Sequence, residues 1–526
     1  MNINLEHVDG HLNREADICI IGAGVAGQTL ASEFQKTNLK VILVESGQQD
    51  FRRDTQDMAR GENVGHPYYN LEDSRLRLFG GTAAIWGGRC AELDEIDFEI
   101  RPYVPHSGWP ISKADLDPYY DKSFNLLGLV RPAKSNLWAQ YGNVSRDLDS
   151  NKFDSGLWAF DEQGERFTNL KRHGLEQCDT VLNATLTDLE KDESGKIVSA
   201  TCHSLKNTSL NVKAKVFVLA AGAIETARIL LAKGQGLGAE HDQLGRYFME
   251  HPHARGGEIT PVNAAQTFRV LPRAIRHQGA RYAAFMRPSE VLQREQQILN
   301  SALSITLRRH AGENMDNVGR TIHTLKQSLP SKKIWRSLYH KGKAGAVRWR
   351  EFSDPWRSVA KMKRSKGKSG VYVVIRAEQS PNPQSRITLS KETDSLGMPR
   401  VALDWQFQDI DRETIRVMME TLNSEYQRLG WGSLEPSKWL YDKNIPWHTD
   451  PLISTHPIGG YHHMGGVRMS HTPRTGVVDS NCKLHDSPNL YVAGSGVFPT
   501  GGWANPTITI IALALRLGDH LKRKLV

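Results

Sequence analysis

Residues 17–47 read DICIIGAGVAGQTLASEFQKTNLKVILVESG. The apolar run Asp17–Ile21 predicts a buried strand, the glycines of GAGVAG at 22–27 predict a tight turn, and the residues after them predict a helix. A second apolar strand, Val41–Val44, ends in the acidic residue Glu45. The order strand, GxGxxG, helix, strand and acid predicts a dinucleotide-binding βαβ unit.

Each residue of this motif has a separate task. Gly22 permits the tight turn, Gly24 lets the backbone approach a pyrophosphate, and Gly27 lets the helix pack closely on the strand. Glu45 can bind a ribose hydroxyl, and an acid at this point favours FAD or NAD over NADP. The alternative interpretation is a tight turn between strand and helix that binds no ligand.

Composition places the chain among ordinary globular proteins of two or three structural units, with 526 residues, 39% of them hydrophobic and 24% charged. The 5 cysteines are scattered and form no CxxC pair, which argues against a disulfide framework and against a metal site. No apolar run is long enough to span a bilayer, and residues 1–15 do not resemble a secretory signal. We therefore expect a cytoplasmic protein.

The positive charge of the chain is concentrated in one segment. Of a formal net charge of +9, residues 331–370 alone contribute a surplus of 11 positive charges, so the remainder is about neutral. Aromatic residues are interleaved with the lysines and arginines of this basic insert. One interpretation is a solvated surface insert, and the other is an amphipathic element that binds anionic lipid at the inner membrane face or a phosphate-bearing substrate. Nothing else in the chain favours a nucleic-acid partner.

Two further glycine-rich stretches suit a close approach to a flat or anionic ligand. Residues 77–90, RLFGGTAAIWGGRC, hold Gly80, Gly81 and Thr82 between small residues. Residues 216–231 combine a buried strand, a turn at Gly222 and an amphipathic helix, which again predicts a strand that runs up to a ligand.

Between residues 253 and 450 the pattern changes to alternating apolar and polar residues, which predicts an antiparallel sheet with one covered face. The amphipathic helix expected at Asp411–Leu429 would pack on that sheet. The segments that we expect as its strands are Thr267–Val270, Arg281–Arg287, Ser301–Leu307, Val371–Ala377, Arg386–Leu389 and Val401–Trp405.

The carboxyl-terminal part contains candidate catalytic residues. Residues 460–469, GYHHMGGVRM, carry two adjacent histidines. A strand at Asn489–Ala493 ends at Gly494 and Ser495, and residues 501–507, GGWANPT, lead into an apolar helix. A histidine and an asparagine on glycine-rich turns form a plausible acid/base pair.

These pieces together resemble the glucose–methanol–choline (GMC) oxidoreductase family of FAD enzymes. The resemblance rests on GxGxxG with Glu45, on Phe79–Thr82, on Ala220–Thr226, and on the run from His462 to Thr507. It implies an α/β, Rossmann-like FAD domain that is discontinuous in sequence, and an α+β substrate domain with a largely antiparallel sheet. The boundaries that we expect are 14–105, 176–252 and 455–526 for the FAD domain, and 106–175 and 253–454 for the substrate domain with its insert 331–370.

The resemblance also implies the roles of single residues. His462 would be the catalytic base, and Asn505 would hydrogen-bond the substrate oxygen. Trp503 is a candidate for stacking on a sugar ring, with simple packing as the alternative, and the neighbouring His463 is a second candidate near the substrate or a turn cap. The residues that we expect around FAD are Gly22, Gly24, Gly27, Glu45, Gly80, Gly81, Thr82, Gly222, Gly494, Ser495, Asn505, Pro506 and Thr507.

Some members of the family link FAD covalently through a histidine in the loop that corresponds to residues 82–88. Residues 84–86 are Ala-Ile-Trp here, so we expect non-covalent FAD. The activity implied is oxidation of a CH–OH group of a sugar, glycoside or polyol by hydride transfer to flavin N5. The lack of a secretory signal favours a dehydrogenase that uses a carrier or quinone, with an oxygen-consuming oxidase as the alternative. The alternatives are a flavoprotein acting on a non-sugar alcohol, a flavoprotein whose basic insert is its main functional surface, and an NAD-linked or C=C-reducing enzyme.

Overall fold

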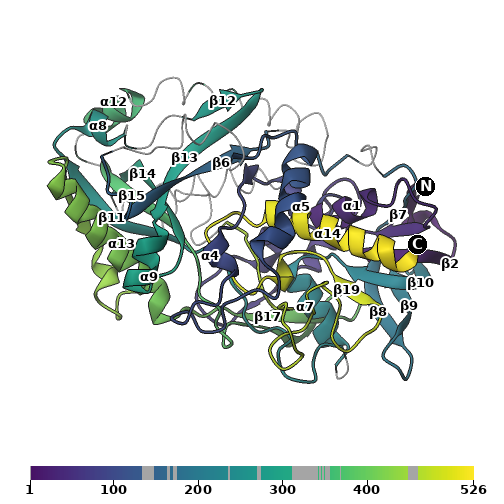
Figure 1. Ribbon diagram of the computed structural model, residues 1–526. Helices are drawn as coiled ribbons and strands as arrows, with labels where there is room; N and C mark the ends of the chain where they lie inside the picture. Colours follow the sequence, from purple (N-terminus) through teal and green to yellow (C-terminus); the bar gives the residue numbers. More distant parts are fainter. Residues whose placement is uncertain are drawn as a thin grey trace.

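The computed structural model describes residues 2–526 apart from 133–146, 163–165, 170–174, 235–236, 269, 271–273, 366, 368, 448–459 and most of 311–355. Figure 1 shows two lobes, one of which contains both chain ends. The amino-terminal and carboxyl-terminal residues of the chain lie side by side in that lobe. The other lobe is built mainly from residues 253–436, with two strands from earlier in the chain.

The lobe with the termini is built on an eight-stranded sheet with a parallel centre. In spatial order its parallel strands are β1 (Asn2–Asn4), β7 (Asp179–Leu182), β3 (Val41–Val44), β2 (His11–Ile21), β10 (Ser209–Leu219) and β19 (Leu490–Val492). The antiparallel strands β9 (Ile197–His203) and β8 (Thr185–Lys191) extend it beyond β10. Strand β2 begins six residues before the apolar run that predicts it, because β10 pairs with it from His11 to Ile21.

Three helices lie against one another over this sheet, α1 (Val25–Ser32), α14 (Thr507–Leu525) and α5 (Lys113–Leu126) (Figure 1). The first begins at Val25, inside the GxGxxG motif, whereas the sequence predicts a helix only after Gly27. Pro506 is the N-cap residue of α14, where the fixed φ of proline suits the start of a helix. Ser112 and Asp115 form a capping box at the start of α5.

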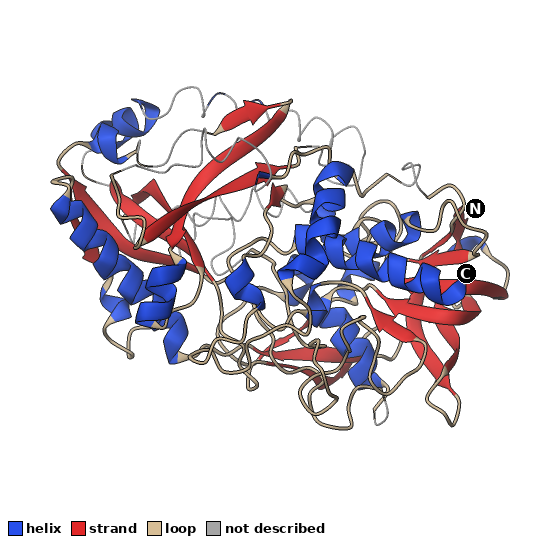
Figure 2. Cartoon of the chain, in the orientation of Figure 1, coloured by secondary structure: helices blue, strands red, loops and turns tan. Residues whose placement is uncertain are grey.

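The second lobe contains an antiparallel sheet, which agrees with its alternating sequence. In spatial order its strands are β18 (Gly432–Pro436), β11 (His253–Pro261), β15 (Ser369–Ala377), β14 (Ser301–Arg309), β13 (Ala280–Pro288), β6 (Phe153–Phe160) and β5 (Arg89–Cys90), with β12 (Ile275–His277) beside β13. Helix α13 (Asp409–Arg428) packs on this sheet through β11, β15 and β18 (Figure 2).

Three of the strands expected for this sheet are placed differently. Thr267 ends helix α8 (Ala264–Thr267), because the side chain of Asn263 accepts the backbone N–H groups of Ala265 and Gln266 and starts a helical turn instead of a strand. The other two, β16 (Arg386–Thr393) and β17 (Pro399–Asp404), form a separate sheet. Its third strand is β4 (Gly61–Asn63), which pairs parallel to β17.

The remaining described α-helices are short. They are α2 (Arg53–Asp57), α3 (Leu71–Ser74), α4 (Glu95–Phe98), α7 (Ala223–Ala232), α9 (Glu290–Gln296) and α12 (Trp356–Arg364). The predicted domain boundaries stay a prediction, since the amino-terminal third of the chain supplies β4 and β5 to sheets built mainly from later residues.

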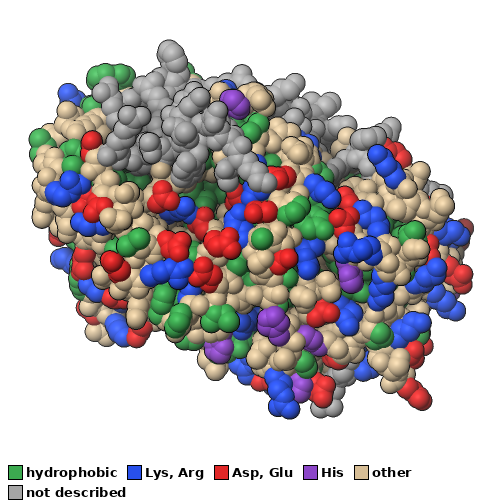
Figure 3. Space-filling view, in the orientation of Figure 1, with side chains coloured by type: hydrophobic (Ala, Val, Ile, Leu, Met, Phe, Trp, Pro, Cys, Tyr) green, Lys and Arg blue, Asp and Glu red, His purple; other side chains and the backbone are tan. Residues whose placement is uncertain are grey.

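Most of the basic insert 331–370 lies outside the described residues, and with it the predicted contact with an anionic membrane. Its described part includes α12, whose Trp356 is 62% exposed. On the face shown in Figure 3, acidic and basic side chains are interspersed, in agreement with a near-neutral remainder of the chain. Among the described helices, none has the length and apolar character needed to cross a membrane.

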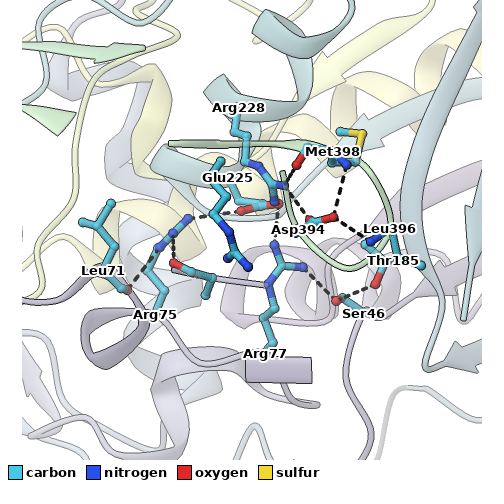
Figure 4. A network of polar contacts seen from close by, with 12 residues as sticks. Ser46, Leu71, Arg75, Arg77, Thr185, Glu225, Arg228, Asp394, Leu396 and Met398 are labelled. Carbon is cyan, nitrogen blue, oxygen red and sulfur yellow. Dashed lines mark hydrogen bonds and ion pairs between the residues drawn. The ribbon is translucent and has the colours of Figure 1, made fainter. Parts of the chain in front are cut away.

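A buried carboxylate joins several segments of the lobe with the termini (Figure 4). Glu225, in the first turn of α7, forms ion pairs with Arg75, Arg77 and Arg228 at 3.1, 2.6 and 2.9 Å. Arg228 also pairs with Asp394 at 2.6 Å, in the hairpin between β16 and β17. Burial alone would raise the pKa of Glu225, but the three guanidiniums lower it far below its ordinary value.

Two further hydrogen bonds extend this network. Arg77 donates to the hydroxyl of Ser46, directly after the predicted ribose ligand Glu45, at 2.8 Å. Arg228 donates through Nε to the carbonyl of Pro399 at 2.6 Å. The network therefore joins the turn after β3, the residues that lead into the glycine loop at 80–82, helix α7, and the small sheet.

We expect Glu225→Gln to lower the free energy of unfolding by about 3–5 kcal/mol, because it leaves buried guanidiniums without their main counter-charge. The pKa of Glu225 is lowered on folding, so its stabilisation is present above its ordinary value of 4.5 and is lost as the pH falls. The variant should therefore lose less stability than the wild type on acidification. Urea unfolding followed by circular dichroism at several pH values measures both effects.

Glu290→Gln is the matched control, because Glu290 makes only an exposed pair with Arg294. We expect no measurable change in stability from it. Equal stability of the two variants at neutral pH would contradict a stabilising role for the Glu225 network.

Candidate functional site

The predicted cofactor residues follow the carboxyl ends of four adjacent parallel strands. Gly22 follows β2, Glu45 follows β3, Gly222 comes soon after β10, and Gly494 comes soon after β19. In open parallel sheets, ligands bind at this edge. The structure thus brings together residues that lie more than 400 positions apart in the sequence.

The glycines of the first turn differ in the space around them. A Cβ atom on Gly22 would lie 2.5 Å from the carbonyl oxygen of Ala220, and one on Gly27 would lie 1.9 Å from the carbonyl oxygen of Gly22. A Cβ on Gly24 would meet no protein atom within 4 Å. Two of the glycines are therefore required by packing of the protein on itself, whereas the third borders open space.

Helices α1 and α7 begin at this edge with free amino termini. Their N-cap residues, Gly24 and Gly222, have no side chain to accept the first backbone N–H groups. A Cβ on Gly222 or on Gly494 would also meet no protein atom within 4 Å. Uncapped helix amino termini beside open space suit the pyrophosphate of a dinucleotide, so these residues fit FAD.

The carboxylate of Glu45 is held in place by backbone donors. It accepts the N–H groups of Ala23 and Gly47, both at 2.9 Å. Burial raises the pKa of Glu45, and these N–H groups together with the charge of Arg77 offset part of that rise. The side chain thus lies beside the turn of the GxGxxG motif, and its bond to a ribose hydroxyl stays a prediction.

The second glycine loop lies against the first. The N–H of Gly80 donates to the carbonyl of Ala23 at 2.9 Å, and a Cβ on Gly81 would lie 3.6 Å from the Cα of Gly24. The hydroxyl of Thr82 accepts the N–H of Leu76 at 3.2 Å. This contact confines the predicted cofactor space between two glycine-rich turns.

The candidate base and its predicted partner are in contact. The amide Nδ2 of Asn505 lies 3.0 Å from Nε2 of His462. On the other side of the ring, Nδ1 of His462 lies 2.8 Å from Nδ1 of a second histidine, His251. Nε2 of His251 lies 2.7 Å from the carbonyl oxygen of Gly502.

This chain of contacts determines where the protons are. A carbonyl oxygen only accepts, so Nε2 of His251 donates to Gly502. Burial lowers the pKa of His251 to about 4, so the ring is neutral at physiological pH and its Nδ1 is an acceptor. Nδ1 of His462 must then be the donor of the next bond. Nε2 of His462 consequently carries a lone pair, which accepts the N–H of Asn505.

Glu250 aligns the backbone of both histidines. Its carboxylate accepts the N–H of His251 at 2.9 Å, the N–H of His462 at 2.8 Å and the hydroxyl of Tyr68 at 2.6 Å. Burial raises the pKa of Glu250 to about 7, despite these donors.

The pairing of the two histidines follows from the backbone. Met249 and Met464 form an isolated antiparallel bridge, with two hydrogen bonds of 2.9 Å. Continuing that register by two residues places His251 opposite His462. No motif of the sequence predicts Glu250 or His251 as site residues. The run Glu-His-Pro-His at 250–253 is the only local signal, and the Met249–Met464 bridge that places it in the site spans more than 200 residues.

Of the two candidates for substrate contact, Trp503 is buried and His463 is partly buried. The ring of His463 lies beside Tyr68 and Phe248, and its Nε2 has no hydrogen-bond partner among the described residues. Burial lowers the pKa of His463 to about 3. The backbone carbonyl of His463 accepts the hydroxyl of Ser495 at 2.6 Å, so Ser495 lies at the same turn.

Trp503 packs its ring on Phe285, with 4.2 Å between the ring centroids, and donates its indole N–H to Asp94 at 2.6 Å. These contacts suit the packing alternative. Stacking of Trp503 on a sugar ring stays a prediction. Pro506 and Thr507, at the start of α14, follow Asn505 directly. The contact between His462 and Asn505 and these predicted cofactor residues therefore belong to one site.

Comparison with known proteins agrees with this site. Residues 381–514, which include His462 and Asn505, match the family model described as GMC oxidoreductase. The chain is 21% identical to the fructose dehydrogenase large subunit of Gluconobacter japonicus, over 96% of this chain and 97% of that protein. It is 23% identical to paromamine 6'-oxidase of Streptomyces fradiae, over 99% of this chain and 94% of that protein.

The fold is also similar to that of a solved structure, pyridoxine 4-oxidase from Mesorbium loti. The TM-score is 0.53 at 15% identity, and the match covers 96% of this chain and 99% of that one. The predicted fold class, a Rossmann-like FAD domain beside a domain with an antiparallel sheet, is confirmed. The roles of individual residues stay predictions.

We expect Gly24→Ala to fold normally and to lose flavin, because the added methyl group meets no protein atom and occupies the space beside the amino terminus of α1. Gly27→Ala should instead destabilise the protein, since its methyl group collides with the backbone of Gly22. The ratio of flavin to protein absorbance and the thermal midpoint separate the two results. Full flavin content in a folded Gly24→Ala protein would show that the cofactor phosphates bind elsewhere.

Proposed function

Because the chain belongs to the GMC oxidoreductases, which are FAD enzymes, we propose that it oxidises a CH–OH group of a sugar, glycoside or polyol to a carbonyl. The observation that carries the proposal is the lone pair on Nε2 of His462, which a chain of directed hydrogen bonds holds next to Asn505. The fructose dehydrogenase relative supports a polyhydroxylated substrate. The two named relatives are a dehydrogenase and an oxidase, so the proposal covers both classes of electron acceptor.

His462 is the base in this proposal. Burial lowers its pKa far below the ordinary value, and the neighbouring imidazoles and the charge of Arg376 lower it further. The ring is therefore neutral at physiological pH and can accept the proton of the substrate hydroxyl. Its Nδ1–H remains bonded to His251, so the imidazole does not need to rotate to present Nε2.

Asn505 is the second participant. Its amide cannot take up a proton, but its N–H groups can hydrogen-bond the oxygen that loses one. In this structure one N–H is directed to Nε2 of His462, so the amide lies where a hydroxyl bound to that nitrogen would be within its reach. When bound, FAD supplies the acceptor, at N5 in this proposal, for the hydride that leaves the carbon. We propose that FAD is held without a covalent link, since residues 84–86 offer no histidine.

We expect His462→Ala to retain its flavin and to lose about 10²–10⁴-fold in the rate of anaerobic flavin reduction by substrate, the range typical of a lost general base. His463→Ala is the matched neighbour, because both imidazoles are partly buried and only one of them contacts Asn505. Unchanged activity in His462→Ala, or a larger loss in His463→Ala, would move the base assignment away from His462.

The pH dependence of the same rate is a second test. A protonated His462 cannot accept a proton, and its pKa lies well below 6.5. The rate of flavin reduction should therefore stay level from about pH 8 to pH 6.5 and fall only at more acidic pH. Glu250, whose pKa is about 7, titrates in the same range, so the profile is also measured in Glu250→Gln. An inflection at or above pH 6.5 that persists in this variant would contradict a neutral base.

A further inference from the structure

Two arginines of the antiparallel sheet reach the same tryptophan. Arg89 is in β5 and Arg376 is in β15, and the guanidinium carbons lie 5.3 and 5.1 Å from the ring centroid of Trp158. Arg376 is only 7% exposed, and Nε of Arg89 is completely buried. Two positive charges thus meet in a mostly buried place beside an aromatic ring.

Neither guanidinium has a counter-charge. In the described part of the chain, Arg89 and Arg376 make no hydrogen bond and no ion pair through their side chains. Three other buried arginines have a carboxylate partner, since Arg101 pairs with Glu378, Arg131 with Glu92 and Arg228 with Asp394. Arg468 has no ion pair either, but it donates a hydrogen bond to the carbonyl of His106. Buried charges are normally paired, so two adjacent exceptions require an explanation.

The pKa values of the two arginines reflect the same lack of a counter-charge. Burial lowers the pKa of Arg376, and the charge of Arg89 lowers it further. Burial also lowers the pKa of Arg89, to about 10. The contact of each with Trp158 is attractive but leaves both charges in place. An anion bound between them would offset the cost that burial imposes.

Further polar atoms without partners gather at this place. Nε1 of Trp158 and both ring nitrogens of His253 are buried and have no hydrogen-bond partner among the described residues. His253 is the direct cross-strand neighbour of Arg376. Together with Nε of Arg89, these atoms provide several donors that the described protein leaves unused.

These residues lie next to His462, the proposed base, and to its partner His251. The charge of Arg376 lowers the pKa values of His462 and His251, which requires that it lie close to both. The ring centroids of Trp158 and Trp503 also lie 6.3 Å apart. Trp503 precedes Asn505 by two residues. A ligand on the arginines would therefore be a neighbour of the base.

We propose that Arg89 and Arg376, with Trp158 and His253, bind an oxyanion carried by the substrate, so that the alcohol oxidised at His462 is a sugar or polyol with a carboxylate or phosphate group. This inference rests on the proposed function and specifies its substrate class. Guanidinium groups suit such a ligand because their planar donor pairs match the oxygens of a carboxylate or a phosphate.

The test compares three compounds that share one ring and differ at a single carbon: glucose, glucuronate and glucose 6-phosphate. Anaerobic reduction of the holoenzyme's flavin is measured with each. We expect at least one of the two acidic compounds to have an apparent dissociation constant about tenfold or more below that of glucose, and the acid that is preferred separates carboxylate from phosphate recognition. Arg89→Gln and Arg376→Gln should each remove this preference, so that the acidic compound and glucose give similar apparent dissociation constants.

Arg294→Gln is the control, because Arg294 is an exposed arginine paired with Glu99 and Glu290. It should retain the preference for the acidic compound. A second measurement needs no turnover: inorganic phosphate, against sodium chloride at equal ionic strength, should raise the thermal midpoint of the wild type. The rise should be absent in Arg89→Gln and Arg376→Gln, and this wild-type measurement remains informative if a variant fails to fold.

The outcomes of the two measurements are distinguishable. Flavin reduction by glucose with no preference for either acid, and no effect of phosphate on the wild type, would overturn the anion site while the proposed function stands. An arginine-dependent effect of phosphate without flavin reduction by any alcohol would support the anion site and contradict the proposed function.

Discussion

The carboxylate of Glu225 is the constraint on which the flavin-binding lobe depends. Three buried guanidiniums are tolerated in one place only because an anion offsets their charge, and this single side chain meets all three. The arginines come from the segment before the glycine loop and from α7, and they bond in turn to Ser46 and Asp394. The two glycine turns, the helix after β10 and the small sheet therefore share one electrostatic centre.

The chain uses buried arginines in two different ways. Around Glu225 each guanidinium has a carboxylate partner, and these ion pairs hold segments of the lobe together. At Trp158 two guanidiniums lie without a carboxylate, beside unpaired donors and within electrostatic reach of His462. Burial of unpaired charges costs stability, and a bound oxyanion would offset that cost.

Features that depend on local sequence could be predicted. The turn at Gly22, the acid at Glu45 and the start of α14 follow from neighbouring residues, and the family resemblance identified His462 and Asn505 as partners, which lie in contact. Thr267–Val270 was wrong as a strand because a cap at Asn263 overrides alternation. Glu250, His251 and Arg376 could not be found, since their roles depend on the Met249–Met464 bridge and on strand neighbours that no local pattern reveals.

The pairing of β10 with both β2 and β19 has a consequence for synthesis of the protein. Strand β2 precedes β10 in the chain, whereas β19 and α14 follow the second lobe. The edge of the sheet that bears Gly22 and Gly222 therefore lacks β19 while about 270 residues between β10 and β19, which include most of the other lobe, are translated. Nascent chains of this protein consequently have a long interval in which bound chaperone or early flavin could protect that edge.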